Sequence, residues 1–179
     1  MSVRLLGYGA VALAALGAVA LLALSTGAIA PLLGDGYTPS AENGTAVHGD
    51  YEHATVVIHD AETGEERGRV EAAIADTRRK RYLGLSATEK LPEDRGMLFV
   101  HDEPGEYTYV MREMSFGIDI VFVAADGTVT TIHEAPKPGP NENGNEQQYP
   151  GEGQYVLEVN RGWTDDRGIE VGDEVEFDL

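Results

Sequence analysis

Residues 96–123 constrain the fold most, because short apolar runs alternate there with a cluster of turn residues. The first run, residues 96–100, leads into Asp-Glu-Pro-Gly at positions 102–105, a composition typical of a turn between strands. After this turn, Tyr107 and Tyr109 alternate with smaller side chains, which predicts a second strand with one aromatic face. We therefore expect a strand, a turn and another strand.

The next apolar run, residues 118–124, contains a single charge, Asp119, and leads to the pair Asp126 and Gly127. An Asp-Gly pair between two apolar runs is the strongest short-range signal for a β-hairpin. We expect residues 128–133 to return antiparallel to the preceding strand.

A second hairpin is expected at the start of the folded domain. Residues 54–59 and 66–75 have the composition of strands, and they flank the turn sequence Glu-Thr-Gly-Glu at positions 62–65. The economical interpretation is an antiparallel pair that begins near residue 53.

A short helix that ends at Leu83 should follow this hairpin. Asp76 and Thr77 are residue types that cap a helix N-terminus, and Gly84 stands where a helix would stop. The helix carries the basic run Arg-Arg-Lys-Arg at positions 78–81. We interpret this run as the solvated face of the helix rather than as a docking site.

The C-terminal part is expected to close the domain. Residues 135–153 hold too much proline, glycine and asparagine for regular structure, which predicts either a binding loop or a mobile insertion. A strand over residues 155–160 should follow this loop. After it, Trp163 is expected in the core and Thr164 is expected to cap one helical turn. Residues 174–177 are expected to form the last strand.

These signals predict one mainly β domain over residues 53–179. We expect a predominantly antiparallel barrel or sandwich of about seven to nine strands with one or two short helices. A segment of this length can bury its own hydrophobic core, so one domain is sufficient.

The N-terminus predicts a membrane anchor within residues 1–33. No charged residue lies between Arg4 and Asp35, and residues 5–30 are rich in leucine, alanine, valine and glycine. A helix of that length would reach roughly 39 Å, more than the ~30 Å hydrocarbon core of a bilayer requires. The alternative is a cleaved signal peptide, against which Pro31 argues, because it would follow the small residues at the cut.

The charges beside this segment predict its orientation. Arg4 precedes the segment and acidic residues follow it, which by the positive-inside tendency leaves the C-terminal domain extracytoplasmic and attached to the cell membrane by a single pass. Residues 34–52 are small and polar and are expected to form a flexible linker. The linker contains a glycosylation pattern at Asn43.

The chain is strongly acidic, with 31 acidic and 13 basic residues and a net charge of -18. Such a charge repels phosphate backbones, so we expect no nucleic-acid partner. The acidic residues are spread along the whole domain, a pattern that resembles the proteins of extreme halophiles, in which concentrated salt screens the repulsion between surface carboxylates.

Several kinds of chemistry lack a sequence signal. The chain has no cysteine, which excludes disulfides and thiolate chemistry. Its five histidines do not have metal-ligand spacing, and no nucleophile elbow or phosphate-binding glycine loop is present. We therefore expect no cofactor and no dedicated metal site.

The first candidate site centres on Asp119, because a carboxylate in an apolar strand must be paired, hydrogen-bonded or exposed. Its natural partner is Arg112, which could approach across a strand pair. Two interpretations stay open. One is an internal ion pair that holds two strands in register. The other is an anion or carbohydrate site lined by Tyr107, Tyr109, Arg112 and Glu113.

Two further features belong to the same candidate site. His133 ends a predicted strand beside the loop of residues 135–153, and Tyr149 in that loop could close over a ligand. Outside this candidate site, Glu158 is a second acid in an apolar run, comparable to Asp119.

The order of several motifs resembles a known family. The motifs are Gly84 and Leu85, GMLFV at 96–100, YVMREM at 109–114, DIVFV at 119–123, YVLEV at 155–159 and GIEVGD at 168–173. Together they are similar to the domain-of-unknown-function family 192 over about residues 71–177. The resemblance implies a small, mainly β fold, often behind a signal peptide or an anchor, and no established biochemical role.

The chain departs from the family pattern in the segment around Arg112. The family commonly shows Phe-Trp-Met-Lys-Asn-Thr where this chain has YVMREM, and Pro-Leu-Asp where it has Gly117, Ile118 and Asp119. Ser86 replaces a usual methionine. Any chemistry that depends on the missing tryptophan, asparagine or proline is therefore not expected here.

Three hypotheses for function follow. The leading one is a membrane-tethered extracytoplasmic binding or accessory module whose partner is a small molecule, a glycan or an envelope protein. The alternative is a hydrolase or lyase that uses Asp119, Glu113 or His133 as acid-base groups. The third is a structural spacer of the cell envelope with no ligand.

Overall fold

The computed structural model describes residues 48–179. The expected membrane anchor, most of the expected linker and the Asn43 pattern therefore lie outside the described residues. Among the residues that are described, no helix combines the length and the apolar character needed to cross a bilayer.

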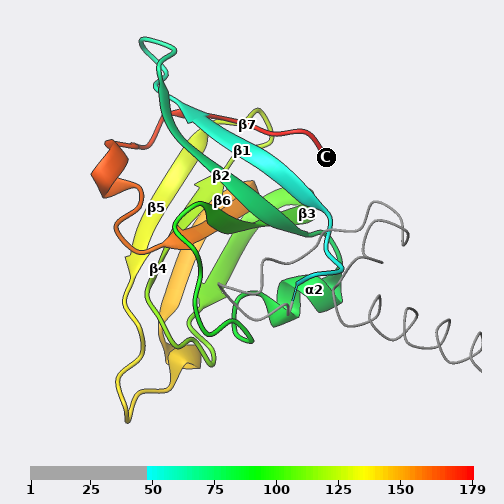
Figure 1. The fold of residues 1–179 in the computed structure, drawn as a ribbon, viewed down its shortest axis with the longest axis vertical. Helices are drawn as coiled ribbons and strands as arrows, with labels where there is room; N and C mark the ends of the chain where they lie inside the picture. Colours follow the sequence, from blue (N-terminus) through cyan, green and yellow to red (C-terminus); the bar gives the residue numbers. More distant parts are fainter. Residues whose placement is uncertain (1–47) are drawn as a thin grey trace, which may run out of the picture. The chain divides into compact units, whose positions relative to one another are not determined.

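The described chain forms one seven-stranded sheet that curls into a half-barrel (Figure 1). The strands are β1 (His53–His59), β2 (Glu66–Ala75), β3 (Arg95–Val110), β4 (Ile118–Val123), β5 (Val129–Ala135), β6 (Gln148–Asn160) and β7 (Glu174–Glu176), arranged in the order β5-β4-β6-β3-β2-β1-β7. The mainly β fold is confirmed. The pairing is antiparallel as expected except between β2 and β3, which pair in parallel.

The parallel pair explains why a helix lies between β2 and β3, since parallel neighbours need a crossover connection. This helix, α2 (Arg78–Leu83), begins at Thr77, whose side chain accepts a hydrogen bond from the Lys80 amide. It ends at Gly84, which has a φ of 51° and whose amide donates to the Lys80 carbonyl. The predicted helix and both of its ends are confirmed. Two short 3-10 helices complete the elements, η2 (Gly144–Glu146) and η3 (Asp165–Arg167).

Both predicted hairpins are confirmed. β1 pairs antiparallel with β2, and β4 pairs antiparallel with β5. At the second hairpin Gly127 has a φ of 93°, and a Cβ atom there would lie 2.9 Å from the Val175 carbonyl oxygen. The turn therefore needs glycine for its backbone conformation and for its close approach to β7.

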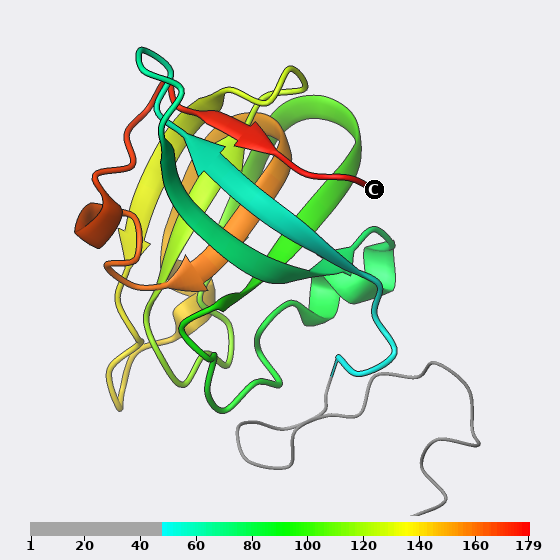
Figure 2. The same ribbon diagram turned by 45° about the horizontal axis from the view of Figure 1, so that its top comes forward.

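The predicted turn at residues 102–105 is wrong. β3 is a single strand of 16 residues that continues through these positions. Both of its halves pair with β6, with a register shift between Val100 and Gly105. The turn residues therefore bend a continuous two-stranded ribbon instead of reversing it. Figure 2 shows β3 and β6 arching together at this bend.

The predicted loop of residues 135–153 is too long by seven residues, because β5 extends to Ala135 and β6 begins at Gln148. Residues 148–153 pair with residues 105–110 of β3, which supplies backbone hydrogen bonds that composition does not anticipate. Pro150 is tolerated there because this half of β6 pairs only with β3 among the described strands, so its missing amide breaks no second ladder.

The sheet buries a hydrophobic cluster on each of its faces, as the alternation of side chains along strands requires. The first cluster includes Leu98, Val121, Leu157 and Trp163, and it confirms the predicted position of Trp163 in the core. The second cluster includes Phe99, Phe122 and Val156, and Leu85, from the segment after α2, packs within it. The far half of the β3–β6 ribbon, which is residues 105–110 and 148–153 beyond the bend, adds Tyr107, Tyr109 and Tyr149 to this second cluster.

Candidate functional site

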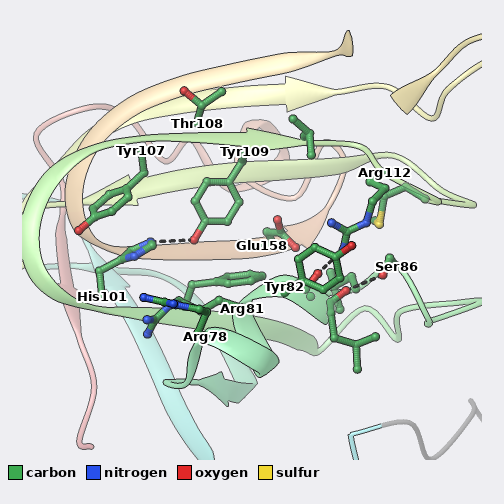
Figure 3. Close-up of a pocket in the computed structure, with 16 residues that line it drawn as sticks. Arg78, Arg81, Tyr82, Ser86, His101, Tyr107, Thr108, Tyr109, Arg112 and Glu158 are labelled. Carbon is green, nitrogen blue, oxygen red and sulfur yellow. Dashed lines mark hydrogen bonds between the residues drawn. The ribbon is translucent and has the colours of Figure 1, made fainter. Parts of the chain in front are cut away.

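A cavity of about 360 Å³ lies beside the second cluster, between α2, the two halves of β3 and the second half of β6 (Figure 3). This volume is at the small end of the range for ligand sites. The residues that line it are Arg78, Arg81, Tyr82, Leu83, Gly84, Leu85, Ser86, Phe99, His101, Tyr107, Thr108, Tyr109, Val110, Arg112, Met114 and Glu158.

The cavity forms where the far half of the ribbon folds back over the near half, residues 95–100 of β3 and 155–160 of β6, on the face of the second cluster. The Tyr109 ring meets the Phe99 ring edge-on, with centroids 5.1 Å apart, and the Phe122 ring at 5.6 Å. Close approach of the ribbon depends on Gly151, where a Cβ atom would lie 2.5 Å from the Phe122 ring. One wall of the cavity is therefore aromatic and is set by packing.

Glu158 is the acidic residue among those that line the cavity, and only 5% of its surface is exposed. It lies on β6 two positions after Val156, so its side chain points to the face of the second cluster. None of the residues in the described part of the chain makes a hydrogen bond to its carboxyl group. Burial raises its pKa to about 8, so the carboxyl group is largely protonated at neutral pH.

An aromatic array forms the wall beside Glu158. The His101 and Tyr107 rings stack with centroids 3.5 Å apart and an angle of 11° between their planes. His101 Nε2 lies 3.0 Å from the Tyr109 hydroxyl oxygen. Burial, and then the charge of Arg81, lower the pKa of His101 to about 4. Its ring is therefore neutral and can accept a hydrogen bond from the Tyr109 hydroxyl. Burial raises the pKa of Tyr109 above its usual range, so its hydroxyl stays protonated.

Three arginines line the remaining wall. Arg81 is held in place, because it donates to the Asp76 carbonyl at 2.8 Å and to the Val100 carbonyl at 2.6 Å. Arg112 lies over the Tyr82 ring, 4.0 Å from its centroid, and donates to the Tyr82 carbonyl.

The third cation, Arg78, pairs with no residue of the described chain. The basic run of α2 is therefore not only a solvated face, because Arg78 and Arg81 both line the cavity.

The sequence-predicted site residues fall into separate places. Tyr107, Tyr109 and Arg112 line the cavity. Glu113 is exposed and has a positive φ of 57°, and it does not line the cavity. His133 and Tyr149 lie together outside the cavity, with ring centroids 5.5 Å apart. His133 Nε2 lies 2.8 Å from the Pro150 carbonyl oxygen, an interaction that holds β5 to the start of β6.

The predicted pairing of Arg112 with Asp119 is wrong. Asp119 is fully buried, and its carboxylate accepts hydrogen bonds from the Gly162 amide at 2.9 Å, the Thr164 amide at 2.9 Å and the Thr164 hydroxyl at 2.7 Å. The Thr164 side chain is thereby occupied and does not cap η3. Asp119 therefore fastens the turn after β6 to β4, which is a structural role.

Several residues of the cavity were not assigned to a site from the sequence. Glu158 gave a signal, as an acid in an apolar run, but nothing linked it to the arginines of α2. Tyr82 gave none, because its position depends on how α2 and the bent ribbon pack. Within residues 48–179, no group of three histidine, aspartate or glutamate side chains is arranged to hold a metal ion.

A family model identifies the family of this chain, and solved structures share its fold. The model of the family DUF192, "Uncharacterized ACR", matches residues 59–177. A crystal structure of a candidate transcription regulator from Sinorhizobium meliloti 1021 has 27% identity and a TM-score of 0.63, and the match covers 71% of this chain and 95% of that one. A crystal structure of a protein of unknown function from Novosphingobium aromaticivorans DSM 12444 has 29% identity and a TM-score of 0.61, with 79% and 99% covered. A comparison with curated proteins gives no match.

Proposed function

Because this chain belongs to the DUF192 family, whose members are uncharacterised, we propose its function from the cavity itself: it is a binding module for a small organic anion. The anionic group of the ligand binds to the arginines, and its apolar body packs on Phe99, Tyr107 and Tyr109. The module is tethered to a membrane and faces the extracytoplasmic side.

One observation carries this proposal, which is the sign of the charge in the cavity. The chain has 31 acidic and 13 basic residues, yet three arginines line this one cavity. The acid among the lining residues, Glu158, is largely neutral at pH 7 because burial raises its pKa to about 8. Arg81 is paired with Asp102 at 3.9 Å, but Arg78 and Arg112 have no acidic partner among the described residues, so the lining is positive within a strongly negative protein. Arginine guanidinium groups bind carboxylate and phosphate oxygens in a bidentate geometry, which favours an anionic ligand.

The cellular setting is proposed from the sequence. The uncharged residues 5–30 and the preceding Arg4 support a single-pass anchor with the domain outside. The excess of dispersed acidic residues supports a haloarchaeal type of protein that works in concentrated salt. Membrane fractionation, followed by protease treatment of intact cells, tests this setting. Recovery of the intact chain in the soluble fraction would contradict it.

An acid-base enzyme that uses Asp119, Glu113 and His133 has little support. Asp119 is occupied by three hydrogen bonds, Glu113 is exposed, and His133 lies outside the cavity. Glu158 has the shifted pKa that catalytic acids often show. The nearby His101, with a pKa of about 4, would be a weak base, so we place catalysis second.

The name of the Sinorhizobium meliloti structure raises regulation of transcription as a further candidate. The charge of the present chain argues against it. A net charge of -18 repels DNA phosphates, and the arginines of the cavity line a small hollow rather than an extended surface.

The test is a thermal-shift and calorimetric screen of the full chain in detergent. Small carboxylates, phosphate esters and neutral sugars are compared at low and molar salt. We expect organic anions to bind, and Arg78→Ala to weaken their binding by roughly tenfold without changing the melting temperature. Arg79→Ala is the matched control, because Arg79 is exposed on the same helix and does not line the cavity.

Two outcomes would overturn the proposal. One is that neutral sugars bind and organic anions do not. The other is that Arg78→Ala and Arg79→Ala have the same effect on binding, because the charge would then act only at long range.

A further inference from the structure

Resting on the proposed function, we infer the chemical class of the ligand: it is an oxo acid, whose anionic group binds to the arginines and whose carbonyl oxygen accepts a hydrogen bond from the carboxyl group of Glu158. Glu158 is thus the residue that determines specificity within the cavity.

The first step is the isolation of the Glu158 carboxyl group. Glu158 is 5% exposed and lines the cavity together with Leu85, Phe99 and Tyr109. Buried polar groups in proteins are almost always hydrogen-bonded, and each exception calls for an explanation. No described residue supplies a partner to this carboxyl group, although it lines a cavity large enough for a small molecule.

The second step is that the neighbouring polar groups are already engaged. The Tyr109 hydroxyl interacts with His101 at 3.0 Å, and the Ser86 hydroxyl donates to the Leu83 carbonyl at 2.5 Å. Neither hydroxyl is hydrogen-bonded to Glu158 in the described chain, and desolvation by burial is what shifts the pKa of this carboxyl group. The polar groups left for a ligand are Arg78, the remaining N–H donors of Arg81 and Arg112, the Thr108 hydroxyl at the exposed edge, and the Glu158 carboxyl group.

The third step is the kind of hydrogen bond that Glu158 offers. A protonated carboxyl group is a donor, whereas a carboxylate can only accept. Burial raises the pKa of Glu158 to about 8, with no offset from a nearby cation, so the proton is present at neutral pH. A ligand carbonyl accepts hydrogen bonds and does not donate them, so it is the complement of this donor.

The arginine donors are charged and the Glu158 donor is neutral. This difference determines which end of the ligand binds to each. Arginine donors favour the charged end of a ligand, because charge-assisted hydrogen bonds are the stronger ones. A neutral donor in an apolar environment favours an uncharged acceptor, since burying a second charge there would be costly. An apolar acid without a carbonyl would fill the cavity and offer Glu158 no acceptor.

The experiment uses matched pairs of acids that differ only in one carbonyl oxygen. The pairs are 4-oxopentanoate with pentanoate, 5-oxohexanoate with hexanoate, and 4-acetylbenzoate with 4-ethylbenzoate, titrated into the full chain at neutral pH by calorimetry. We expect the oxo acid of at least one pair to bind roughly tenfold more tightly than its parent acid, because the parent leaves the buried carboxyl group unpaired.

Three variants assign this preference to Glu158. Glu158→Leu should bring the ratio of the two affinities to about one, while Glu158→Gln should keep a preference because its amide can donate. Glu152→Gln is the matched control, since Glu152 is exposed on the same strand, outside the cavity. Near-UV circular dichroism verifies that each variant is folded. Should the leucine variant fail to fold, the glutamine variant and the wild-type ratio still decide.

The outcomes separate the two proposals. If acids bind but every oxo acid binds like its parent, the inference is wrong and the binding function stands. A preference that survives in Glu158→Leu also overturns the inference. If none of the acids binds, both the anion-binding function and the inference built on it are rejected.

Discussion

Two buried carboxyl groups in neighbouring strands have opposite environments. Asp119 on β4 and Glu158 on β6 are each an acid within an apolar run, and Glu158 pairs with Ile120, the residue after Asp119. Because side chains alternate along strands, the two carboxyl groups point to opposite faces of the sheet. Asp119 accepts three hydrogen bonds from the turn after β6, whereas Glu158 has none from the described residues.

The difference shows that burial of an acid does not by itself indicate a site. Asp119 is the more buried of the two, yet its hydrogen bonds are complete and leave nothing for a ligand. Glu158 keeps an unused polar group at the wall of a cavity that also contains three arginines. The partners of a buried acid, rather than its depth, separate a structural role from a functional one.

The largest expected effect tests the structural half of this comparison. Asp119→Ala removes a charged acceptor and leaves three donors unpaired, two of them backbone amides. We expect the free energy of unfolding to fall by roughly 4 kcal/mol. Urea unfolding at molar salt measures it. The matched variant Glu158→Leu should be neutral or stabilising, because it replaces an unpaired buried acid by an apolar side chain.

Two results would contradict this expectation. If Asp119→Ala costs less than about 1 kcal/mol, its hydrogen bonds contribute no more than an average exposed contact does. If Glu158→Leu instead costs as much as Asp119→Ala, Glu158 has a structural partner in solution, and the contrast between the two acids is lost.

The second expected effect is the pH dependence that Glu158 adds to stability. Its pKa is 4.5 in the unfolded chain and about 8 in the folded one. Between these values the folded state holds a proton that the unfolded state has released, so stability falls as pH rises. We expect a fall of about 3 kcal/mol, less than the full shift would give because the cavity admits water.

Glu158→Gln should remove this fall, and the measurement is the difference between the wild-type and variant unfolding curves from acid to alkaline pH. The difference is needed because other groups of the cavity titrate as well. The pKa of His101 is lowered to about 4, so protonation of the unfolded chain lowers stability as pH decreases below 6.5. Burial raises the pKa of Tyr109, so its hydroxyl stays protonated over this range. Equal slopes in both proteins would count against a buried, neutral Glu158.

Local elements of the fold could be predicted from the sequence because their signals are local. The Asp126 and Gly127 pair predicts its hairpin, and Thr77 and Gly84 predict both ends of α2. The bent ribbon of β3 and β6 could not be predicted in this way. Its turn-like residues at 102–105 are compatible with either a reversal or a bend, and the choice depends on pairing with residues almost 50 positions later in the chain.

The site was predictable only in part, for the same reason. Tyr107, Tyr109 and Arg112 share one strand, so their alternation and spacing indicated a common surface. Arg78 and Glu158 lie 80 positions apart in the sequence. They line the same cavity only because α2 crosses over the sheet and the ribbon bends above it. Asp119 is recognisable as the single charge in an apolar run. Its partners belong to a turn whose position the sequence pattern does not specify.

The most direct measurement is the titration of Glu158 itself in the full chain. Carbon-13 labelling of glutamate side chains gives one carboxyl NMR signal for each residue, and the signal of Glu158 is assigned as the one missing from Glu158→Gln. The account predicts a midpoint near 8 for this signal, because the carboxyl group is buried without a partner. A midpoint near 4.5, the value of an ordinary glutamate, would show an ionised and solvated or paired carboxylate at neutral pH and would contradict the account.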